Sequence, residues 1–227
     1  MKKTVAAIVP AAGSSSRMEG LSKILTPVNG LPLIGHTLLA LEACAWIDEI
    51  IVAARHEDVY PVADLCRSLN VSKVSRVLRG GKTRPLSVLI ALMETKAGIV
   101  AIHDGARPCV TPALCAAVIE KAIQTDAALP ALPLADSAKQ AEGGVIKRSI
   151  DRSALLTVQT PQCFEAGLIK GALAKALREG LEITDDSAAV EALPFPVHTV
   201  PGDPRNIKVT TAGDLLIASA LLRGAPA

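Results

Sequence analysis

The apolar run TVAAIVP, residues 4–10, followed directly by the loop AAGSSSRMEGLSKIL, residues 11–25, decides which fold this chain adopts. The run is short and apolar, as expected of a buried strand. The loop carries three consecutive serines, Arg17 and Lys23, and has little helical or strand periodicity. Because α/β sheets bind ligands beyond the C-terminal ends of their strands, a loop that leaves a first strand in this way is a candidate anion site.

Strand-like and helix-like segments alternate through the first half of the chain. Further strand-like runs occupy residues 49–54, 74–80 and 98–104. Apolar residues recur at the helical spacings of three and four in the segments between them, residues 31–45, 58–69 and 83–96. The alternation predicts an α/β fold with a Rossmann-like, mostly parallel twisted sheet and helices on both faces. At this length we expect a single domain over residues 1–227.

The pattern changes in residues 134–152, where a Gly-Gly turn separates two polar, strand-like arms. We predict a β-hairpin arm that projects from the sheet. Because a polar hairpin without a core is marginally stable alone, we expect it to pack on a partner subunit. A helix at residues 166–179, a strand at 197–200 and a helix at 211–222 complete the expected order.

The composition argues against nucleic-acid and membrane partners. The 24 basic and 22 acidic side chains leave a net charge of +2, with no long run of one sign. Aromatic residues make up 2% of the chain, which leaves few rings to stack on nucleic-acid bases. No apolar run approaches the ~20 residues that a membrane helix requires.

The five scattered cysteines include no Cys-x-x-Cys pair, which argues against a zinc site and against a disulfide framework. They are typical of reduced thiols, so we expect a cytoplasmic protein. The start MKKTVAAIVPAAG is similar to a short signal peptide, and secretion is the alternative. Its apolar part is very short and continues directly into the polar loop, which favours the cytoplasm.

The opening loop matches neither of the two common phosphate-binding patterns. G-x-G-x-x-G is absent, and G-x-x-x-x-G-K-[ST] fails because Leu21 follows Gly20. What remains is a turn of small residues followed by hydroxyl donors and cations, at Ala11, Ala12, Gly13, Ser14, Ser15, Ser16, Arg17 and Lys23. Backbone N–H groups in such a turn can cradle an anion, and the Arg17 fork suits phosphate oxygens. The alternative is a solvated connection with incidental charges.

Other segments bring matching chemistry to the same edge of the sheet. In HDGARP, residues 103–108, Asp104 could bind a hard cation such as Mg²⁺, and Arg107 could face a second anion. The alternatives are a turn cap for Asp104 and a surface ion pair for Arg107. On an extended chain His103 points away from Asp104, so we assign His103 a structural role.

Two further segments are candidates for ligand contacts. In GGKTRPLSV, residues 80–88, the double glycine allows close approach, and Ser87 could read the edge of a base; the alternative is an ordinary helix start. Lys208 stands alone among uncharged neighbours in NIKVTT and is the second candidate for a ligand contact. The alternative is a surface lysine whose alkyl chain packs on apolar surface while its charge reaches solvent.

Taken together, PAAGSSSRM…SK, GGxxRxxSV, HDGARP, DR…QTPQCF, ITDDSAAVE and NIKVTT resemble, in order, the 2-C-methyl-D-erythritol 4-phosphate cytidylyltransferases of the non-mevalonate isoprenoid pathway. The resemblance implies that a phosphate oxygen of methylerythritol phosphate attacks the α-phosphorus of CTP, releasing pyrophosphate. It also implies Mg²⁺ or another divalent cation, and a homodimer that interlocks through the arm.

The resemblance implies roles for individual residues. The catalytic cations are Arg17, Lys23 and Lys208. The nucleotide contacts are Ala11, Ala12, Gly13, Gly81, Ser87 and Asp104, of which Asp104 also binds the metal. The residues that handle methylerythritol phosphate are Arg107, Ser137, Arg152, Thr160 and Thr184, of which Ser137 and Arg152 could serve a neighbour's site.

The chain departs from the family at four positions. Ile24 and Leu25 follow Lys23 where a glutamine is common after the lysine, which puts the local packing in doubt. Lys82 replaces a frequent acidic residue, and Ser137 replaces a threonine.

Three alternatives differ from this interpretation in acceptor, nucleotide or activity. A ribitol 5-phosphate cytidylyltransferase would share the fold, the loop and CTP, but the arm and IDRSALLTVQTPQCF favour the methylerythritol enzymes. A hexose-phosphate uridylyl- or guanylyltransferase would use another nucleotide. A catalytically silent nucleotide-binding protein would not require Arg17, Lys23, Asp104 and Lys208 together.

Overall fold

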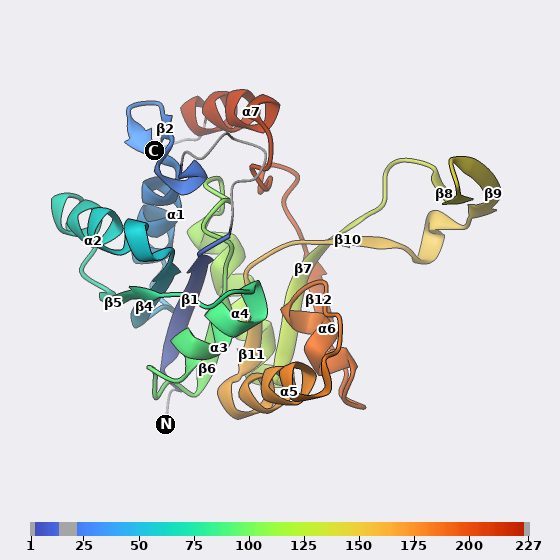
Figure 1. Cartoon of the computed structure of the whole chain (residues 1–227), viewed down its shortest axis with the longest axis horizontal. Helices are drawn as coiled ribbons and strands as arrows, with labels where there is room; N and C mark the ends of the chain where they lie inside the picture. The colour runs from blue at the N-terminus through green and yellow to red at the C-terminus, as the bar shows by residue number, and fades with distance from the viewer. Residues whose placement is uncertain (1–2, 14–21, 225–227) are drawn as a thin grey trace.

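The structure is a computed structural model that describes residues 3–13 and 22–224 (Figure 1). Its main sheet has eight strands in the order β10-β7-β11-β6-β1-β4-β5, with β12 also paired to β7. The strands of the first half are β1 (Val5–Ala11), β4 (Glu49–Ala54), β5 (Val74–Arg79) and β6 (Ile99–Ile102), all parallel. The others are β7 (Ala127–Pro133), β10 (Leu156–Val158), β11 (Gln162–Glu165) and β12 (His198–Pro201). Because β10 and β11 alone run antiparallel to their neighbours in this sheet, the prediction of a mostly parallel sheet is confirmed.

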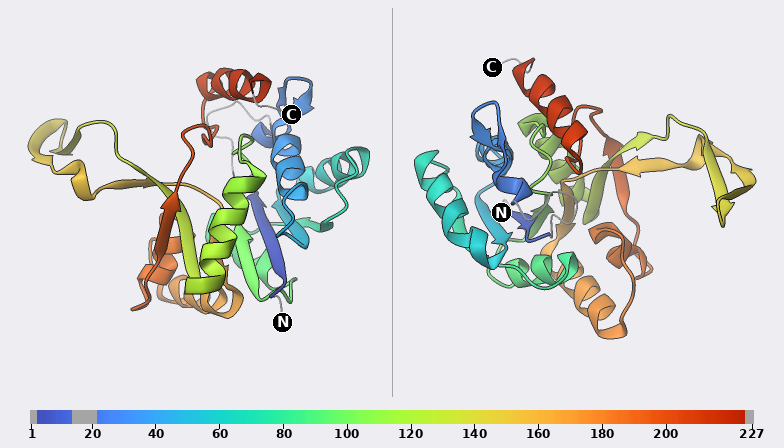
Figure 2. Two further views of the ribbon diagram at one scale, coloured as in Figure 1. Left: turned by 180° about the vertical axis from the view of Figure 1, so that it is seen from behind. Right: turned by 45° about the horizontal axis from the view of Figure 1, so that its top comes forward.

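Alternate residues of β1 pack into two separate cores, one on each face of the sheet. Val5, Ala7 and Val9 contact the side covered by α1 (Leu33–Glu42), α2 (Val59–Ser68) and α4 (Pro112–Thr125). Ala6 and Ile8 contact the side covered by α3 (Arg84–Leu92), α5 (Ala166–Glu179) and α6 (Asp186–Glu191). Figure 2 shows these helices on both faces, as predicted. A strand buried on both faces has to be apolar throughout, which accounts for the unbroken run that opens the sequence.

Most of the predicted helices and strands form close to their expected bounds, but α4, α6, β7, β10 and β11 were not predicted. The last helix is α7 (Ala212–Arg223), which begins with a capping box between Thr211 and Asp214. Short elements complete the structure: the strands β2 (Pro27–Val28) and β3 (Leu31–Pro32), and the 3-10 turns η1 (Lys23–Leu25), η2 (His56–Asp58) and η3 (Arg152–Ala154). Among the described residues, no helix is long and apolar enough to cross a bilayer.

The predicted hairpin arm is present and stands away from the main sheet (Figures 1 and 2). Its strands, β8 (Ala138–Glu142) and β9 (Val145–Ile150), form a two-stranded sheet of their own. The turn between them places Gly143 and Gly144 at φ values of 55° and 79°, a left-handed backbone that favours glycine. Beyond the turn, Val145 and Ile146 are 60% and 64% exposed. The arm therefore presents apolar side chains that this chain does not cover.

A buried ion pair joins two helices on the same face of the sheet. Arg84 begins α3 and Asp186 begins α6, and Nη2 of the arginine lies 2.7 Å from Oδ2 of the carboxylate. The Asp186 side chain is 1% exposed, and this burial raises its pKa although Arg84 acts in the opposite direction. A carboxylate in this position depends on its cation, because an unpaired buried charge is strongly destabilising.

Replacing Arg84 with alanine is expected to lower the free energy of unfolding by about 3–5 kcal/mol, because Asp186 then loses its ion-pair partner. Urea denaturation followed by circular dichroism measures the change. Arg178→Ala is the control, since the side chains of Arg178 and its partner Glu179 are 73% and 42% exposed; its effect should stay below about 0.5 kcal/mol. Equal losses of stability in the two variants, or strictly additive effects of Arg84→Ala and Asp186→Ala, would contradict a buried ion pair of this strength.

Candidate functional site

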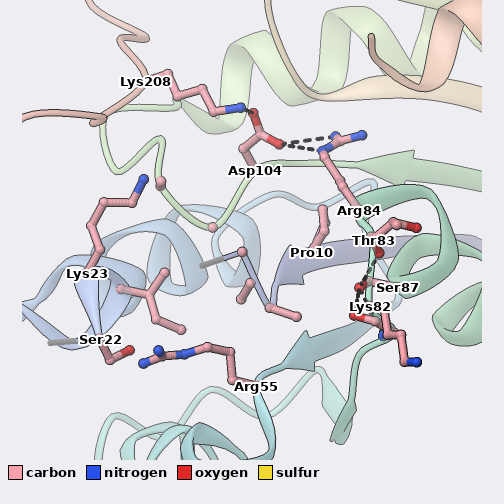
Figure 3. A pocket seen from close by; sticks show the side chains of 17 residues that line it. Pro10, Ser22, Lys23, Arg55, Lys82, Thr83, Arg84, Ser87, Asp104 and Lys208 are labelled. Carbon is pink, nitrogen blue, oxygen red and sulfur yellow. Dashed lines mark hydrogen bonds and ion pairs between the residues drawn. The ribbon is translucent and has the colours of Figure 1, made fainter. Parts of the chain in front are cut away.

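A cavity of about 460 Å³ lies beyond the C-terminal ends of β1, β4 and β6 (Figure 3). Eight of the predicted site residues line it. From the first loop and the double-glycine turn come Ala11, Ala12, Gly13, Lys23, Gly81 and Ser87; Asp104 and Lys208 complete the set. No aromatic side chain is among the described lining residues. The volume suits a small-molecule ligand, and the position agrees with the general rule for such sheets.

The Asp104 carboxylate is the electrostatic centre of this cavity. Its Oδ1 accepts hydrogen bonds from Nη2 and Nε of Arg84, at 3.1 and 3.2 Å. Its Oδ2 lies 2.8 Å from Nζ of Lys208 and 3.6 Å from Nε of Arg107. Burial alone would raise the pKa of Asp104, but Arg84, Lys208 and Arg107 together hold it well below its ordinary value. Three cations thus surround one ionised carboxylate, and the excess positive charge favours an anionic ligand.

His103 and Thr160 hold Asp104 from behind. The Thr160 hydroxyl accepts the Asp104 backbone N–H at 3.1 Å and lies 2.9 Å from Nδ1 of His103. The other ring nitrogen of His103 lies 3.3 Å from the carbonyl oxygen of Arg107. Burial lowers the pKa of His103 to about 4, so the ring is neutral near pH 7. A neutral ring adds no further charge beside the three cations, which agrees with the structural role expected for His103.

The double-glycine turn packs closely against the first loop. A Cβ on Gly80 would lie 2.6 Å from Cβ of Ala12, and one on Gly81 would lie 2.4 Å from Cγ of Leu86. The hydroxyl of Ser87 accepts the backbone N–H of Gly81 at 3.0 Å and donates to the carbonyl of Thr83 at 2.9 Å. The turn therefore keeps its shape through Ser87, and only glycine fits at both positions.

Lys23 and Lys208 come from opposite ends of the chain and meet at this cavity. Nζ of Lys23 donates to the carbonyl of Val209 at 2.9 Å, beside Lys208 in the chain. Figure 3 shows both lysine side chains at the cavity. Ile24 is 7% exposed in the core beneath α1, and Leu25 packs against the same cluster. The unusual residues after Lys23 thus have a packing role.

Of the remaining predicted residues, those that the structure describes do not line the cavity. Ser14, Ser15, Ser16 and Arg17 lie outside the described residues. Arg107 contacts Asp104 from the side and donates from Nη1 to the carbonyl of Asn206 at 2.7 Å. Thr160 is buried behind Asp104, and Thr184 is exposed just before α6. Ser137 and Arg152 are exposed on the arm, where Arg152 donates to the carbonyl of Ala135.

Sequence reasoning missed Arg55, which also lines the cavity. The residue follows β4 directly, so its position after a predicted parallel strand was the signal that could have identified it. Reasoning also missed the ion pair of Arg84 with Asp104, because the arginine was considered only as part of a helix start. Lys82, where the family often has an acid, is another cation in the lining.

The described residues contain no cluster of three or more His, Cys, Asp or Glu side chains that could hold a metal by itself. Asp104 is the carboxylate in the described lining. One carboxylate suits Mg²⁺, which commonly keeps water ligands and takes the rest from substrate phosphates. The site therefore fits a cation that arrives with a polyphosphate.

Comparisons with known proteins agree with this geometry. A family model described as 2-C-methyl-D-erythritol 4-phosphate cytidylyltransferase matches residues 5–224. A protein of that name from Syntrophus aciditrophicus is 40% identical, over 98% of this chain and 97% of its own length. Another, from Halalkalibacterium halodurans, is 37% identical over 95% of each.

Solved structures give the same result. The 2-C-methyl-D-erythritol 4-phosphate cytidylyltransferase of Thermus thermophilus is 35% identical with a TM-score of 0.80, covering 95% of this chain and 98% of that one. The 4-diphosphocytidyl-2C-methyl-D-erythritol synthase of Anaerococcus prevotii is 28% identical with a TM-score of 0.87, covering 98% and 100%. The resemblance predicted from the ordered motifs is confirmed: the chain belongs to the 2-C-methyl-D-erythritol 4-phosphate cytidylyltransferase family.

Proposed function

We propose that this chain transfers CMP from CTP to 2-C-methyl-D-erythritol 4-phosphate in isoprenoid precursor biosynthesis, as a single nucleotidyltransferase domain over residues 1–227. The observation that carries the proposal is the cavity in which Lys23, Lys208 and the cations around Asp104 converge. We place the enzyme in the cytoplasm, because all five cysteines are free thiols.

The reaction is a displacement at phosphorus. An oxygen of the acceptor phosphate forms a bond to the α-phosphorus of CTP, the bond to the bridging oxygen of pyrophosphate breaks, and the products are CDP-methylerythritol and pyrophosphate. The nucleophile is already an anion, so no general base is needed. The protein has to bring two polyanions together and stabilise the charge that develops at the transferred phosphorus.

Lys23 and Lys208 are suited to that task, together with Arg17. The ammonium of Lys23 and the carbonyl it contacts lie beside Lys208, so both lysines can face the same phosphate oxygens. Bound Mg²⁺ would supply positive charge to offset that of the phosphates. Asp104 would hold it, and Lys208 would then pair with phosphate in place of the carboxylate oxygen that it contacts in this structure.

Cytidine fits the wall formed by the first loop and the double-glycine turn. The backbone of Ala11, Ala12, Gly13 and Gly81 offers donors and acceptors to the base and ribose, and Ser87 holds the turn in position. Because glycine has no side chain, the nucleotide could approach the backbone closely at these positions.

The acceptor would lie toward Arg107, Thr160 and Thr184, and the arm of a second subunit would complete its site. Ser137 and Arg152 are exposed and lie outside the lining of their own chain's cavity. Val145 and Ile146, exposed at the end of the arm, supply apolar surface for a homodimer contact. These observations support a dimer in which each arm serves the neighbour.

Purified protein should release pyrophosphate from CTP in the presence of Mg²⁺ and methylerythritol phosphate, and chelation of the metal should abolish release. Parallel reactions with ribitol 5-phosphate, and with UTP or GTP in place of CTP, are expected to be much slower. Turnover with ribitol 5-phosphate alone, or with another nucleotide but not CTP, would replace the proposed substrate. Binding of CTP without turnover on any acceptor would favour a silent nucleotide-binding protein.

Lys23→Ala and Arg17→Ala should each lower kcat by several powers of ten while the Kd for CTP rises much less, because these cations act on charge that develops in the transition state. Steady-state kinetics and calorimetric CTP titration measure the two effects. Arg178→Ala, a charge removal on the exposed face of α5, serves as the control. Equal losses in kcat and CTP affinity would indicate simple charge anchoring.

Mixing the inactive variants Lys23→Ala and Arg152→Ala should restore activity if the arm serves the neighbouring site. Random exchange makes half of the dimers mixed, each with one intact site, so about a quarter of wild-type activity is expected. The control is a mixture of Lys23→Ala with Lys208→Ala, two residues that meet within one chain, which should remain inactive. Recovery in both mixtures, or in neither, would contradict the proposed role of the arm.

A further inference from the structure

Beside Lys23 lies a buried carboxylate that the proposed function does not use. Asp58 ends η2 and stands immediately before α2, and the residue is 3% exposed. It is not part of the cavity lining. Its Oδ2 accepts two hydrogen bonds, from the hydroxyl of Ser22 at 2.9 Å and from Nε of Arg55 at 2.8 Å. Both donors line the cavity. Asp58 therefore lies behind the cavity wall and is hydrogen-bonded to two residues of that wall.

Ser22 connects Asp58 to the turn that carries Lys23. It occupies the cap position of η1, where its carbonyl accepts the N–H of Leu25 at 2.9 Å. The hydroxyl of a serine in this position commonly caps its own turn, but here it makes no such bond. It donates instead to Asp58, which lies 36 residues further along the chain. The side chain therefore ties the Lys23 turn to the start of α2.

The charge of Asp58 is balanced by Arg55. Besides the bond to Asp58, Nη1 of this arginine lies 3.3 Å from Oε1 of Glu57. The Arg55 side chain is 20% exposed, and Figure 3 shows it beside Ser22 at the cavity. Arg55 thus pairs with the same carboxylate oxygen that accepts the hydrogen bond from Ser22.

The other side of the turn is also held. Ile24 is 7% exposed in the core, and the ammonium of Lys23 contacts the carbonyl of Val209. Ser22 anchors the turn on the N-terminal side of the lysine, where the described residues begin again. Loss of its hydroxyl would remove this anchor and leave the backbone of Lys23 less firmly placed.

We propose that Asp58 is a positioning residue for Lys23 and acts through the hydroxyl of Ser22. The inference rests on the proposed catalytic role of Lys23. A displacement of about 1 Å in a catalytic group can lower a rate by about a hundredfold. Ser22→Ala should therefore lower kcat by roughly ten- to a hundredfold and change the KM for CTP much less, whereas Ser22→Thr, which keeps the hydroxyl, should restore most of the rate.

A double-mutant cycle on kcat tests whether Ser22 and Asp58 act through Lys23. If Ser22 acts through Lys23, Ser22→Ala lowers kcat in the wild-type enzyme but has no further effect, within about twofold, when Lys23 is already alanine. Asp58→Asn, which removes the charge and keeps the shape, should show the same dependence on Lys23. Unfolding curves establish that each variant is folded under assay conditions.

The matched control is Ser75→Ala. Ser75 also donates its hydroxyl to a carboxylate, Oε1 of Glu49 at 2.6 Å, but it lies on the exposed edge strand β5 and outside the lining of this cavity. The kcat of the Ser75→Ala variant should equal that of the wild-type enzyme.

The outcomes distinguish the catalytic role of Lys23 from the positioning role of Asp58. If Lys23→Ala keeps wild-type kcat, the proposed role of Lys23 is wrong and the positioning role falls with it. If Lys23→Ala is nearly inactive but Ser22→Ala has no effect, or has the same effect in both backgrounds, Lys23 keeps its role and the positioning by Asp58 is overturned.

Discussion

The ionised carboxylate of Asp104 is the interaction on which the rest of the site depends. It lies two residues beyond the end of β6 and contacts three cations. Arg107 belongs to the same loop, whereas Arg84 and Lys208 come from distant parts of the chain. Without this anion, three cations would face one another in a partly desolvated cavity, where like charges repel strongly. Arg84 extends the same arrangement to Asp186, so the charge balance at the cavity also helps to hold α6. The neutral ring of His103 behind Asp104 keeps that balance, since a fourth positive charge there would compete for the carboxylate.

The architecture and much of the cavity could be predicted because their causes are local. Apolar runs with helical segments between them specify a parallel sheet, and the ends of parallel strands meet at one edge, which brings Lys23, Gly81 and Asp104 together. By contrast, β7 carries Pro130 and Pro133, residues that argue against a paired strand, yet it pairs with three neighbours. Its place follows from tertiary packing, which a single segment of sequence does not reveal.

The charge network could not be predicted for a related reason. Arg84 was identifiable as the start of a helix, but its two carboxylate partners stand in distant segments and become neighbours only in the folded chain. Arg55 belongs to no recognised motif. The order of motifs was enough to identify the family, whereas the way each charge is held depends on residues between the motifs. Asp58 is an example, because it belongs to none of the motifs and accepts a hydrogen bond from Ser22 of the first motif.

The described lining residues include no aromatic side chain, and this affects which substitutions could change the nucleotide preference of the site. In the proposed nucleotide complex, no ring of the described lining would stack on the base, which would meet main-chain groups close to the double-glycine turn. Every residue except proline carries the same main-chain donor and acceptor, so side-chain substitutions outside Gly80 and Gly81, where only glycine fits, leave these groups in place. The preference for one nucleotide would then depend on the backbone conformation of the loop. Changing that preference would require insertions or deletions that reshape the loop. Under the proposed function, many side chains around this cavity could therefore change without changing the base that is bound.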